Sequence, residues 1–442
     1  MPGPVSGSTI SELIGDLKQY YSSEQVINDL MLKNRPLFGL VEKDFEISGQ
    51  GGNIQGTPSY PTTAQGGYPV PIISSGGASP SQTFANAQTN QQPAVVRQFQ
   101  VPVVSTFNLA TVNRVLQGAS RNNTGAFLDA MKLETDAAFQ SVSNYTAAAL
   151  YRNATGSFGQ VNSSGVSAGG VIQLTNITDA INFNVNAVLR AAASDGGTLR
   201  NGTGYVIAVD FSLGTLTVSG SAPVNGVPGT GGIPSGWSAG DYLVFDGSEN
   251  LMIAGLLTYL PNTSQTRPTP GFASNINQLF NVDRSISPQV YAGTWLQAGT
   301  ESIEEALIDG VSEVCRLGGM PDMIFMNPVS YRALCKELQS RRHYITAEGP
   351  TGISYSGITI DGDQGPVKVL SDPWCPPKTA FILTMSTWKM IGYQPFPDFL
   401  QYMDGMEYMR VYNADAIEMR CGGDINLTCN APGWNGVINL NQ

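Results

Sequence analysis

The stretch Gly318–Leu334, GGMPDMIFMNPVSYRAL, carries in close succession the signals for a helix end, a buried strand and a helix start. Gly318-Gly319 stops a helical pattern, because glycine readily adopts the left-handed conformation that closes many helices. The apolar DMIF, which begins at Asp322, is typical of a buried strand. Asn327-Pro328 then supplies a capping side chain and a proline suited to a first helical turn. We therefore predict a strand followed at once by a helix through VSYRALCKEL.

Another helix is expected immediately before this stretch. Ser302-Ile303-Glu304-Glu305 forms a capping box, in which serine and the second glutamate each satisfy a backbone N–H of the other. The apolar residues that follow recur on one face of a helix: Ile303, Leu307, Val311, Val314 and Leu317. The carboxylates in the first turn are favoured by the helix dipole, so they do not by themselves indicate catalysis.

Strands are expected on both sides of these two helices. Downstream, GPVKVL (365–370), AFILTM (380–385) and YMRVYNADAIEMR (408–420) are typical of strands and hairpins. Upstream, short strands separated by Gly, Pro and Asn fill residues 170–262, which favours a small barrel or sandwich. Because strands flank a long intervening stretch, we predict an α+β protein in which distant segments share one sheet.

Composition excludes several classes of function. The chain has 442 residues and a net charge of −11, so as a whole it does not coat nucleic acid. No run of residues is apolar enough to span a membrane, and no export signal opens the sequence, so we expect synthesis in the cytoplasm. The five cysteines contain no C-x-x-C pair, which favours reduced thiols over a zinc site or disulfides.

A run from Ile47 to Val96 contains no charged residue at all. It nevertheless carries aromatic and aliphatic side chains, which a solvated linker would not keep. The run ends in RQFQV, where Phe99, Val101 and Val103 alternate as one face of a strand. We predict a long two-stranded excursion that lies on another protein surface. A long amphipathic helix follows, from about residue 124 to 152.

One motif suggests a serine hydrolase. Gly236–Gly240 matches the G-x-S-x-G elbow around Ser238, and the sole histidine, His343, is the only candidate base. An elbow requires a strand before the serine and a helix after it, whereas Ser238 follows a Pro- and Gly-rich loop and precedes a strand. A second match at 165–169 lies in another Gly- and Ser-rich loop. We therefore expect no catalytic residue.

Metal and cofactor sites are not indicated either. Asp361–Gly365 begins like a calcium loop, but it lacks the acidic fifth position, so we expect a turn between strands. With one histidine and no cysteine cluster, the usual zinc ligands are missing. No phosphate-binding G-x-x-x-x-G-K-[ST] motif occurs. We expect no cofactor and no metal ion.

The order of these parts resembles the major capsid protein of tailed double-stranded DNA bacteriophages, the Hong Kong 97-like fold. The resemblance rests on the helical N-terminus, the excursion, the long helix, and GGMPDMIFMNPVSYRAL followed by GPVKVLSDPWCPPKTAFIL. It implies an N-terminal arm (1–44), an extended E-loop (45–106), a peripheral domain with a spine helix (107–169), an inserted small β-barrel-like domain (170–262), an axial domain (263–365), peripheral-domain strands (366–425) and a C-terminal axial strand (426–442).

The resemblance also implies a function without catalysis. Copies of the chain would form hexamers and pentamers of an icosahedral head, assembled in the host cytoplasm, that encloses double-stranded DNA without binding it specifically and involves no membrane. The expected partners are the chain itself, a separate scaffolding protein, a portal and a decoration protein. The expected inter-subunit contacts of the E-loop are Tyr60, Tyr68, Ile72, Phe84 and Phe99.

One feature of the family is absent. Some members join subunits through an E-loop lysine, but here no lysine occurs between Lys43 and Lys132, which excludes that covalent cross-link. Two alternatives stay open at this point. A secreted or surface β-rich adhesin would fit the low charge, and a serine hydrolase would fit the motif at Ser238.

Overall fold

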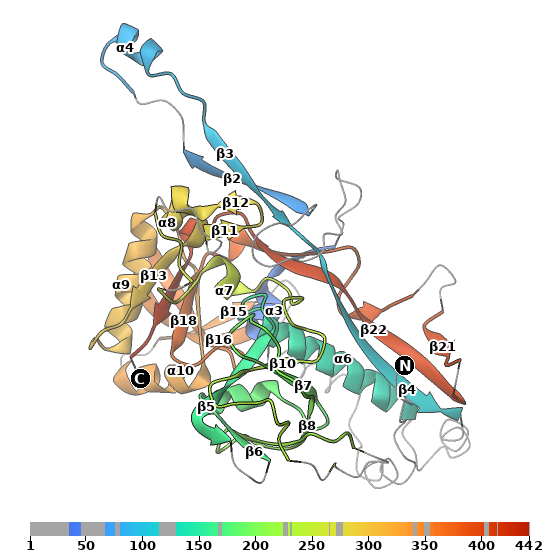
Figure 1. Cartoon of the computed structure of the whole chain (residues 1–442). Coiled ribbons are helices and arrows are strands. Elements are labelled where there is room, and N and C mark those ends of the chain that lie inside the picture. Colours follow the sequence, from blue (N-terminus) through green and yellow to red (C-terminus); the bar gives the residue numbers. More distant parts are fainter. Residues whose placement is uncertain are drawn as a thin grey trace. The chain divides into compact units, whose positions relative to one another are not determined.

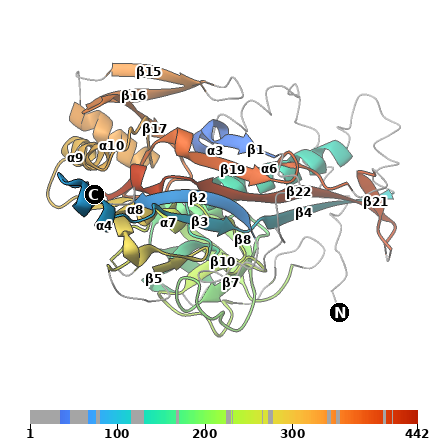
Figure 2. The same cartoon turned by 90° about the horizontal axis from the view of Figure 1, so that it is seen from above.

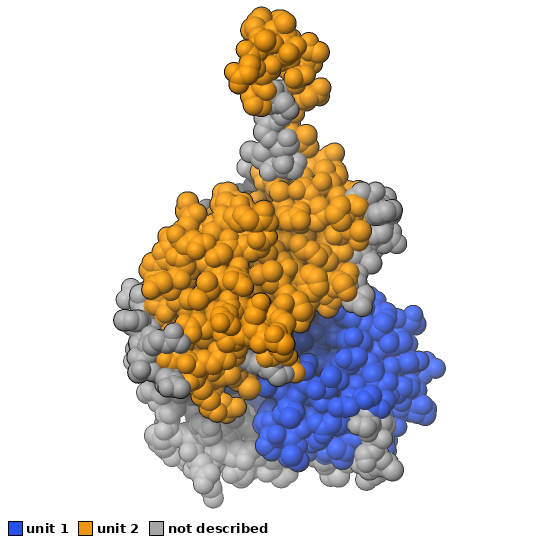
Figure 3. Space-filling model, turned by 90° about the vertical axis from the view of Figure 1, so that its left-hand side faces the viewer, with its two compact units in different colours: residues 1–39, 105–252, 392–425 blue, residues 40–104, 253–391, 426–442 orange. Residues whose placement is uncertain are grey.

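The protein is described by a computed structural model (Figure 1), which divides into two compact units (Figure 3). Unit 1 comprises Met1–Gly39, Ser105–Met252 and Gly392–Ile425, and unit 2 comprises Leu40–Val104, Ile253–Ile391 and Asn426–Gln442. The described residues are 35–45, 67–75, 80–114, 130–166, 170–223, 229, 232–264, 266–270, 277–338, 343–348, 354–401, 406–412 and 414–441.

The main sheet of unit 2 has seven strands in the order β13-β23-β18-β14-β17-β16-β15. Strand β14, from the DMIF stretch, pairs in parallel with β17 and antiparallel with β18. At one edge of the sheet, β13 pairs in parallel with the C-terminal β23. Segments far apart in sequence therefore share the sheet, as predicted. The strands are β13 (Thr294–Gln297), β14 (Met323–Met326), β15 (His343–Glu348), β16 (Ser354–Gly362), β17 (Gly365–Ser371), β18 (Thr379–Leu383) and β23 (Gly436–Asn439).

Two helices, α9 (Ile303–Arg316) and α10 (Pro328–Leu338), form the core of unit 2 together with this sheet. The predicted capping box is confirmed, because Glu305 N donates to Ser302 Oγ and Ser302 N donates to the Glu305 carboxylate. At Gly310 a Cβ atom would lie 2.4 Å from Ile438 Cδ1 and 2.6 Å from Ile382 Cδ1, so a larger residue would require these buried side chains to shift. Asn327 Oδ1 accepts from Val329 N, as expected for the start of α10.

Unit 2 also contains an antiparallel hairpin that projects from the sheet and helices (Figure 1). Its strands are β2 (Tyr68–Ser75) and β3 (Val95–Val101), and a helix, α4 (Phe84–Thr89), lies at its far end. The predicted two-stranded excursion is thus confirmed over the described residues. The remaining elements of unit 2 are β1 (Glu42–Asp44), α7 (Leu256–Tyr259), β11 (Gln278–Leu279), β12 (Val282–Asp283), η3 (Arg284–Ile286), α8 (Pro288–Ala292), η5 (Met385–Thr387), β19 (Trp388–Gly392) and η6 (Pro432–Trp434).

Unit 1 contains the predicted long helix, α6 (Ala130–Ala149), packed against a sheet. Asn108 Nδ2 of strand β4 (Val104–Asn113) donates to Ala138 O of α6 at 3.2 Å, and the Phe139 and Phe399 rings lie 5.1 Å apart. Strand β4 runs beside the long β22 (Ala416–Cys429), whose last four residues belong to unit 2 (Figure 2). The other elements here are α3 (Pro36–Leu40), β20 (Asp398–Phe399) and β21 (Tyr408–Arg410).

The middle of the chain forms a closed six-stranded barrel in unit 1, in the order β10-β5-β6-β9-β8-β7. Its interior is filled by apolar side chains such as Phe158, Leu216 and Leu243, all buried, so it is a packed core and not a channel. The elements are β5 (Ser157–Val166), β6 (Val171–Leu174), η1 (Ile177–Asn182), β7 (Val188–Ala192), β8 (Gly204–Asp210), β9 (Thr215–Ser219) and β10 (Tyr242–Phe245).

The inserted barrel begins before the predicted residue 170, because β5 starts at Ser157 and closes the barrel between β10 and β6. Most of the predicted N-terminal arm, residues 1–34, lies outside the described residues. Among the helices of the described part of the chain, none has the length and apolar character needed to cross a membrane.

Candidate assembly surfaces

The root of the β2–β3 hairpin is held by a cluster of aromatic rings within unit 2. Phe99 is 0% exposed, and its ring lies 6.1 Å from Tyr259, 6.3 Å from Phe280 and 6.3 Å from Tyr291, in each case edge to face. Aromatic pairs at such distances favour this geometry because the ring edge is positive and the face negative. The sequence produces the arrangement by placing Phe99 and Val101 on the same face of β3.

Polar contacts fix the same root. Asn426 Nδ2 donates to Pro102 O, just beyond β3, while Asn426 Oδ1 accepts from Ala254 N at 2.8 Å. Gln100 N donates to Phe280 O at 3.2 Å, and Asn281 Nδ2 donates to Gln100 Oε1 at 2.8 Å. Asn426 is almost completely buried, so its amide joins three distant segments of unit 2 where water cannot replace the bonds.

The far end of the hairpin, residues 80–98, is exposed almost throughout, and we call it the hairpin tip (Figure 3). Helix α4 contains no buried residue, Phe84 is 79% exposed and Val96 is 54% exposed. The tip has no charged residue before Arg97. The hairpin tip thus presents three exposed large apolar side chains, Phe84, Val95 and Val96.

An apolar groove of about 410 Å³ lies near the hairpin root, within unit 2. We call it the root groove. One wall comes from β2 through Pro71 and Ile72, and another comes from Val290 of α8 and from Leu317. Trp434 of η6, which is 46% exposed, completes it. The other lining residues are Gln289, Asn430, Ala431 and Gly433, so the lining contains no charged side chain.

The structure distributes the five predicted contact residues unevenly. Phe84 is exposed at the hairpin tip and Tyr68 is half-buried at the start of β2. Phe99 and Ile72 are buried within unit 2, and Ile72 also lines the root groove. Tyr60 lies outside the described residues.

A second exposed apolar feature lies on the barrel, in the turn between β8 and β9. Asp210 Oδ1 accepts from Ser212 N, Ser212 Oγ and Leu213 N, and the pKa of Asp210 is lowered by these bonds, with that from the Ser212 hydroxyl contributing most. The turn therefore has a defined shape. It presents Phe211, which is 61% exposed, together with Leu213. Sequence analysis did not single out these two residues.

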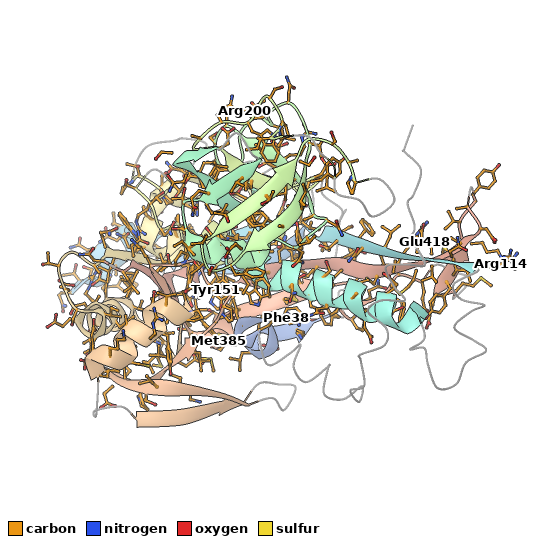
Figure 4. All side chains as sticks on the ribbon, turned by 90° about the horizontal axis from the view of Figure 1, so that it is seen from below. Phe38, Arg114, Tyr151, Arg200, Met385 and Glu418 are labelled. Carbon is orange, nitrogen blue, oxygen red and sulfur yellow. The ribbon has the colours of Figure 1, made fainter. Side chains whose placement is uncertain are left out.

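The elbow motif at Ser238 is a structural turn. A loop precedes Ser238 and strand β10 follows it, as predicted and opposite to the order that a nucleophile requires. Ser238 N donates to Asp241 Oδ2 at 2.8 Å, and buried Asp241 pairs with Arg200 at 3.0 Å. Arg200 lies on the barrel (Figure 4). The carboxylate of Asp241 thus organises the motif. The stretch Asp361–Gly365, predicted as a turn between strands, joins β16 to β17, and its turn residues are Asp363 and Gln364.

The cysteine thiols and the possible metal ligands do not form a reactive site in the described residues. Burial raises the pKa of the Cys421 thiol to about 11 and that of the Cys429 thiol to about 12, so both stay protonated at neutral pH. Cys375 is also buried, whereas Cys315 and Cys335 are half-exposed, and none of the five cysteines forms a disulfide. Within the described ranges, no three His, Cys, Asp or Glu side chains gather as metal ligands would.

Comparison with known proteins identifies the fold. Residues 245–399 match the family model described as SU10 major capsid protein. The subunit in the "Cyanophage A-1(L) capsid asymmetric unit" has a TM-score of 0.51 and 10% identity, over 98% of this chain and 99% of that one. An encapsulin of Synechococcus elongatus PCC 7942, in the holo-SrpI complex, has a TM-score of 0.44 and 8% identity, over 97% and 93%. No curated protein sequence matches the chain.

Proposed function

We propose that this chain, a major capsid protein with the Hong Kong 97-like fold, builds a phage head through contacts made by its hairpin tip. It is a structural protein of the virion and not an enzyme. The observation that carries the proposed contact is the hairpin tip, which is exposed, apolar in part and uncharged up to Val96. Such a segment gains free energy when another copy covers it, at roughly 25 cal/mol per Å² of apolar surface.

The assembly we propose is a closed icosahedral shell of hexamers and pentamers. A contact between two different surfaces of neighbouring copies repeats around a rotation axis and closes into a ring. A projecting tip that meets a different surface of the next copy makes a contact of this kind, which can repeat around the axis and close the ring. In this scheme residues 45–106 are the E-loop, 107–156 and 384–425 the peripheral domain, and 263–383 with 426–442 the axial domain, because strands β17 and β18 share the seven-stranded sheet with β13, β14 and β23.

The shell we propose is held by burial and hydrogen bonds. No lysine lies between Lys43 and Lys132, so the E-loop cannot supply the amine for a covalent cross-link between subunits. Stability of the mature head therefore depends on many weak contacts, each repeated in every subunit. We expect such shells to separate into subunits in strong denaturant without proteolysis or reduction.

The net charge of the chain and its resemblance to capsid proteins indicate what the shell encloses and which proteins it binds. With a net charge of −11 the subunit suits a container for double-stranded DNA that must be packed without being bound tightly. We expect a separate scaffolding protein and a portal, and a decoration protein on the outer surface. Assembly would take place in the host cytoplasm.

Electron microscopy of the purified chain tests the proposed function. The chain is concentrated over a range of salt and crowding-agent concentrations, and the products are examined by negative stain and by size-exclusion chromatography. We expect capsomers, tubes or closed shells of uniform curvature. Monomers under every condition, including co-expression with the genes encoded beside this one, would contradict the proposal.

A further inference from the structure

We propose that Asn201-Gly202, in the barrel loop between β7 and β8, is a site of spontaneous deamidation, and that the product loosens the turn at residues 236–241. The proposal concerns a reaction of the chain with water and goes beyond the assembly function. The chain contains three Asn-Gly pairs, which begin at Asn201, Asn225 and Asn435. Asn225 lies outside the described residues, so Asn435-Gly436 is the comparison within the same chain.

The reaction joins two groups of neighbouring residues. The backbone nitrogen of Gly202 loses its proton to hydroxide and attacks Cγ of the Asn201 side chain. A new N–Cγ bond forms, the Cγ–Nδ2 bond breaks, and Nδ2 takes up a proton from water and leaves as ammonia. Water then opens the cyclic imide at either carbonyl. The products are aspartate and isoaspartate, in which the backbone runs through the side chain, and both carry a carboxylate that is ionised at neutral pH.

The loop presents both reacting groups to solvent. Asn201 and Gly202 are exposed, and neither the Asn201 side chain nor the Gly202 N–H bonds another described residue. Gly202 has no Cβ to hinder the approach of its nitrogen, and its φ of +90° is one that favours glycine. The nucleophile, the electrophilic carbon and the water that completes the reaction can therefore meet without unfolding the barrel.

The residues on either side hold this loop in place. Arg200 N donates to Ala191 O at 2.7 Å, and Gly204 at the start of β8 pairs with Leu189 of β7. The reactive pair lies between these two anchors. Its exposure is thus a property of the folded barrel and does not require the strands to separate.

The Asn-Gly pair at Asn435 has the opposite environment. Asn435 is 0% exposed, and its Oδ1 accepts from Thr384 N at 2.8 Å and from Trp388 Nε1 at 2.9 Å. Its Nδ2 donates to Ala431 O at 2.9 Å. Gly436 begins β23, which is paired on both sides, with β13 and β18. The same dipeptide must here break several buried bonds before it can react, so the fold protects it.

The loop at Asn201 packs closely against the turn at residues 236–241. A Cβ atom on Gly236 would lie 2.7 Å from Asn201 O and 3.2 Å from Asn201 N, so this glycine of the G-x-S-x-G motif allows the two backbones to approach. Trp237 Nε1 donates to Gly202 O at 3.4 Å. Isoaspartate adds one carbon to the backbone at position 201, which displaces both of these carbonyl groups. A densely packed region transmits such a shift to its neighbours.

The new charge acts on the same turn. Arg200 pairs with buried Asp241 at 3.0 Å, and Asp241 Oδ2 accepts from Ser238 N at 2.8 Å. A carboxylate at position 201 competes with Asp241 for the guanidinium of Arg200. A buried carboxylate that loses its cation is strongly disfavoured, so the turn that Asp241 organises becomes less stable.

Ageing of the purified full-length chain tests the site. The chain is kept at neutral and mildly alkaline pH, and chymotrypsin, which cuts after Tyr205, separates Asn201 from Asn225 for mass spectrometry. We expect the mass change from amide to acid at Asn201, with aspartate and isoaspartate both present, at a rate about tenfold or more above that at Asn435. The rate should rise with pH because the nucleophile is the deprotonated nitrogen.

Two results would overturn the assignment of the site. One is a native Asn201 that stays unchanged under conditions in which Asn435 of the urea-unfolded chain is converted. The other is an equal rate at Asn201 and Asn435 in the native chain, which would show that the fold does not select the exposed pair.

Hydrogen exchange tests the effect of the product. Exchange at residues 236–241 should be faster in the aged wild type than in the fresh protein. Asn201→Gln is the matched control, because it keeps an amide but cyclises far more slowly, and its exchange should not change on ageing. Asn201→Asp adds the charge without the extra backbone carbon and should give a smaller increase. Unchanged exchange at residues 236–241 in fully deamidated protein would contradict the claim that the product loosens the turn.

Discussion

The two ends of the β2–β3 hairpin have opposite environments although they belong to one element. At the root, Phe99 is fully buried among three rings and Asn426 bonds Pro102 O. At the tip, Phe84 is exposed and α4 has no buried residue. The same residue type therefore serves folding at one end and, on our account, assembly at the other. Substitutions at the two ends should separate these two properties.

The largest effect on folding is expected at the root. Phe99→Ala removes the ring that joins Tyr259, Phe280 and Tyr291, and it should lower the free energy of unfolding by about 3–5 kcal/mol. Urea denaturation of the unassembled subunit, followed by tryptophan fluorescence, measures this loss. A variant as stable as the wild type would show that the ring cluster does not anchor the hairpin.

A smaller loss is expected from Asn426→Ala. The substitution leaves Pro102 O and Ala254 N buried without their partner, which costs about 1–3 kcal/mol for each unsatisfied group. Hydrogen exchange should increase first at residues around Pro102 and Ala254. Asn90→Ala, at an exposed position of the tip, is the matched control and should leave both stability and exchange at the root unchanged.

At the tip, Phe84→Ala should change the free energy of unfolding by no more than about 0.5 kcal/mol, because an exposed ring contributes little to the isolated subunit. The same urea titration used for Phe99→Ala measures it. Equal losses of unfolding free energy for Phe84→Ala and Phe99→Ala would contradict the distinction between the two ends of the hairpin.

Thiol labelling compares the reactivity of buried and half-exposed cysteines, and of these predictions it concerns the smallest effect. The pKa of Cys429 is raised to about 12 by burial, so its thiol stays protonated at pH 8 and should not react with a disulfide reagent. Because the folded pKa is raised, the stability due to burying this neutral thiol is present at pH 8 and decreases only as pH rises from about 9 towards 12.

The half-exposed thiols provide the comparison. In the native subunit only Cys315 and Cys335 should be labelled at pH 8, and the buried Cys375, Cys421 and Cys429 should react after unfolding. Mass spectrometry of labelled peptides identifies the sites. Rapid native labelling of Cys429 would show that the core near the hairpin root opens readily.

Much of the fold could be predicted because its signals are local. The capping box at Ser302 and the cap at Asn327 both occur as expected, since each depends on residues within one turn of helix. The alternation of Phe99, Val101 and Val103 correctly indicated a buried face. Such patterns reflect the periodicity of a strand or helix, which the sequence carries directly.

What could not be predicted depends on distant partners. Alternation showed that Phe99 is buried but not what buries it, and the rings that do so come from residues 259–291 of the same chain. The first barrel strand, β5, was not predicted, because its sequence SFGQVNSSGV is rich in Gly and Ser and the strand is stabilised by pairing with β10 and β6. Helix α4 was missed because its short sequence FANAQT has no side-chain cap bond.

The most direct test of the account is to remove residues 80–94 of the hairpin tip and keep the root. Residues 80–94 are replaced by a short Gly-Ser turn, and the variant is compared with the wild type by thermal unfolding and by electron microscopy under the same assembly conditions. We predict a folded subunit whose melting temperature lies within about 2 °C of the wild type and which forms no shells. Shells of normal size and yield from this variant would contradict the claim that the tip carries assembly.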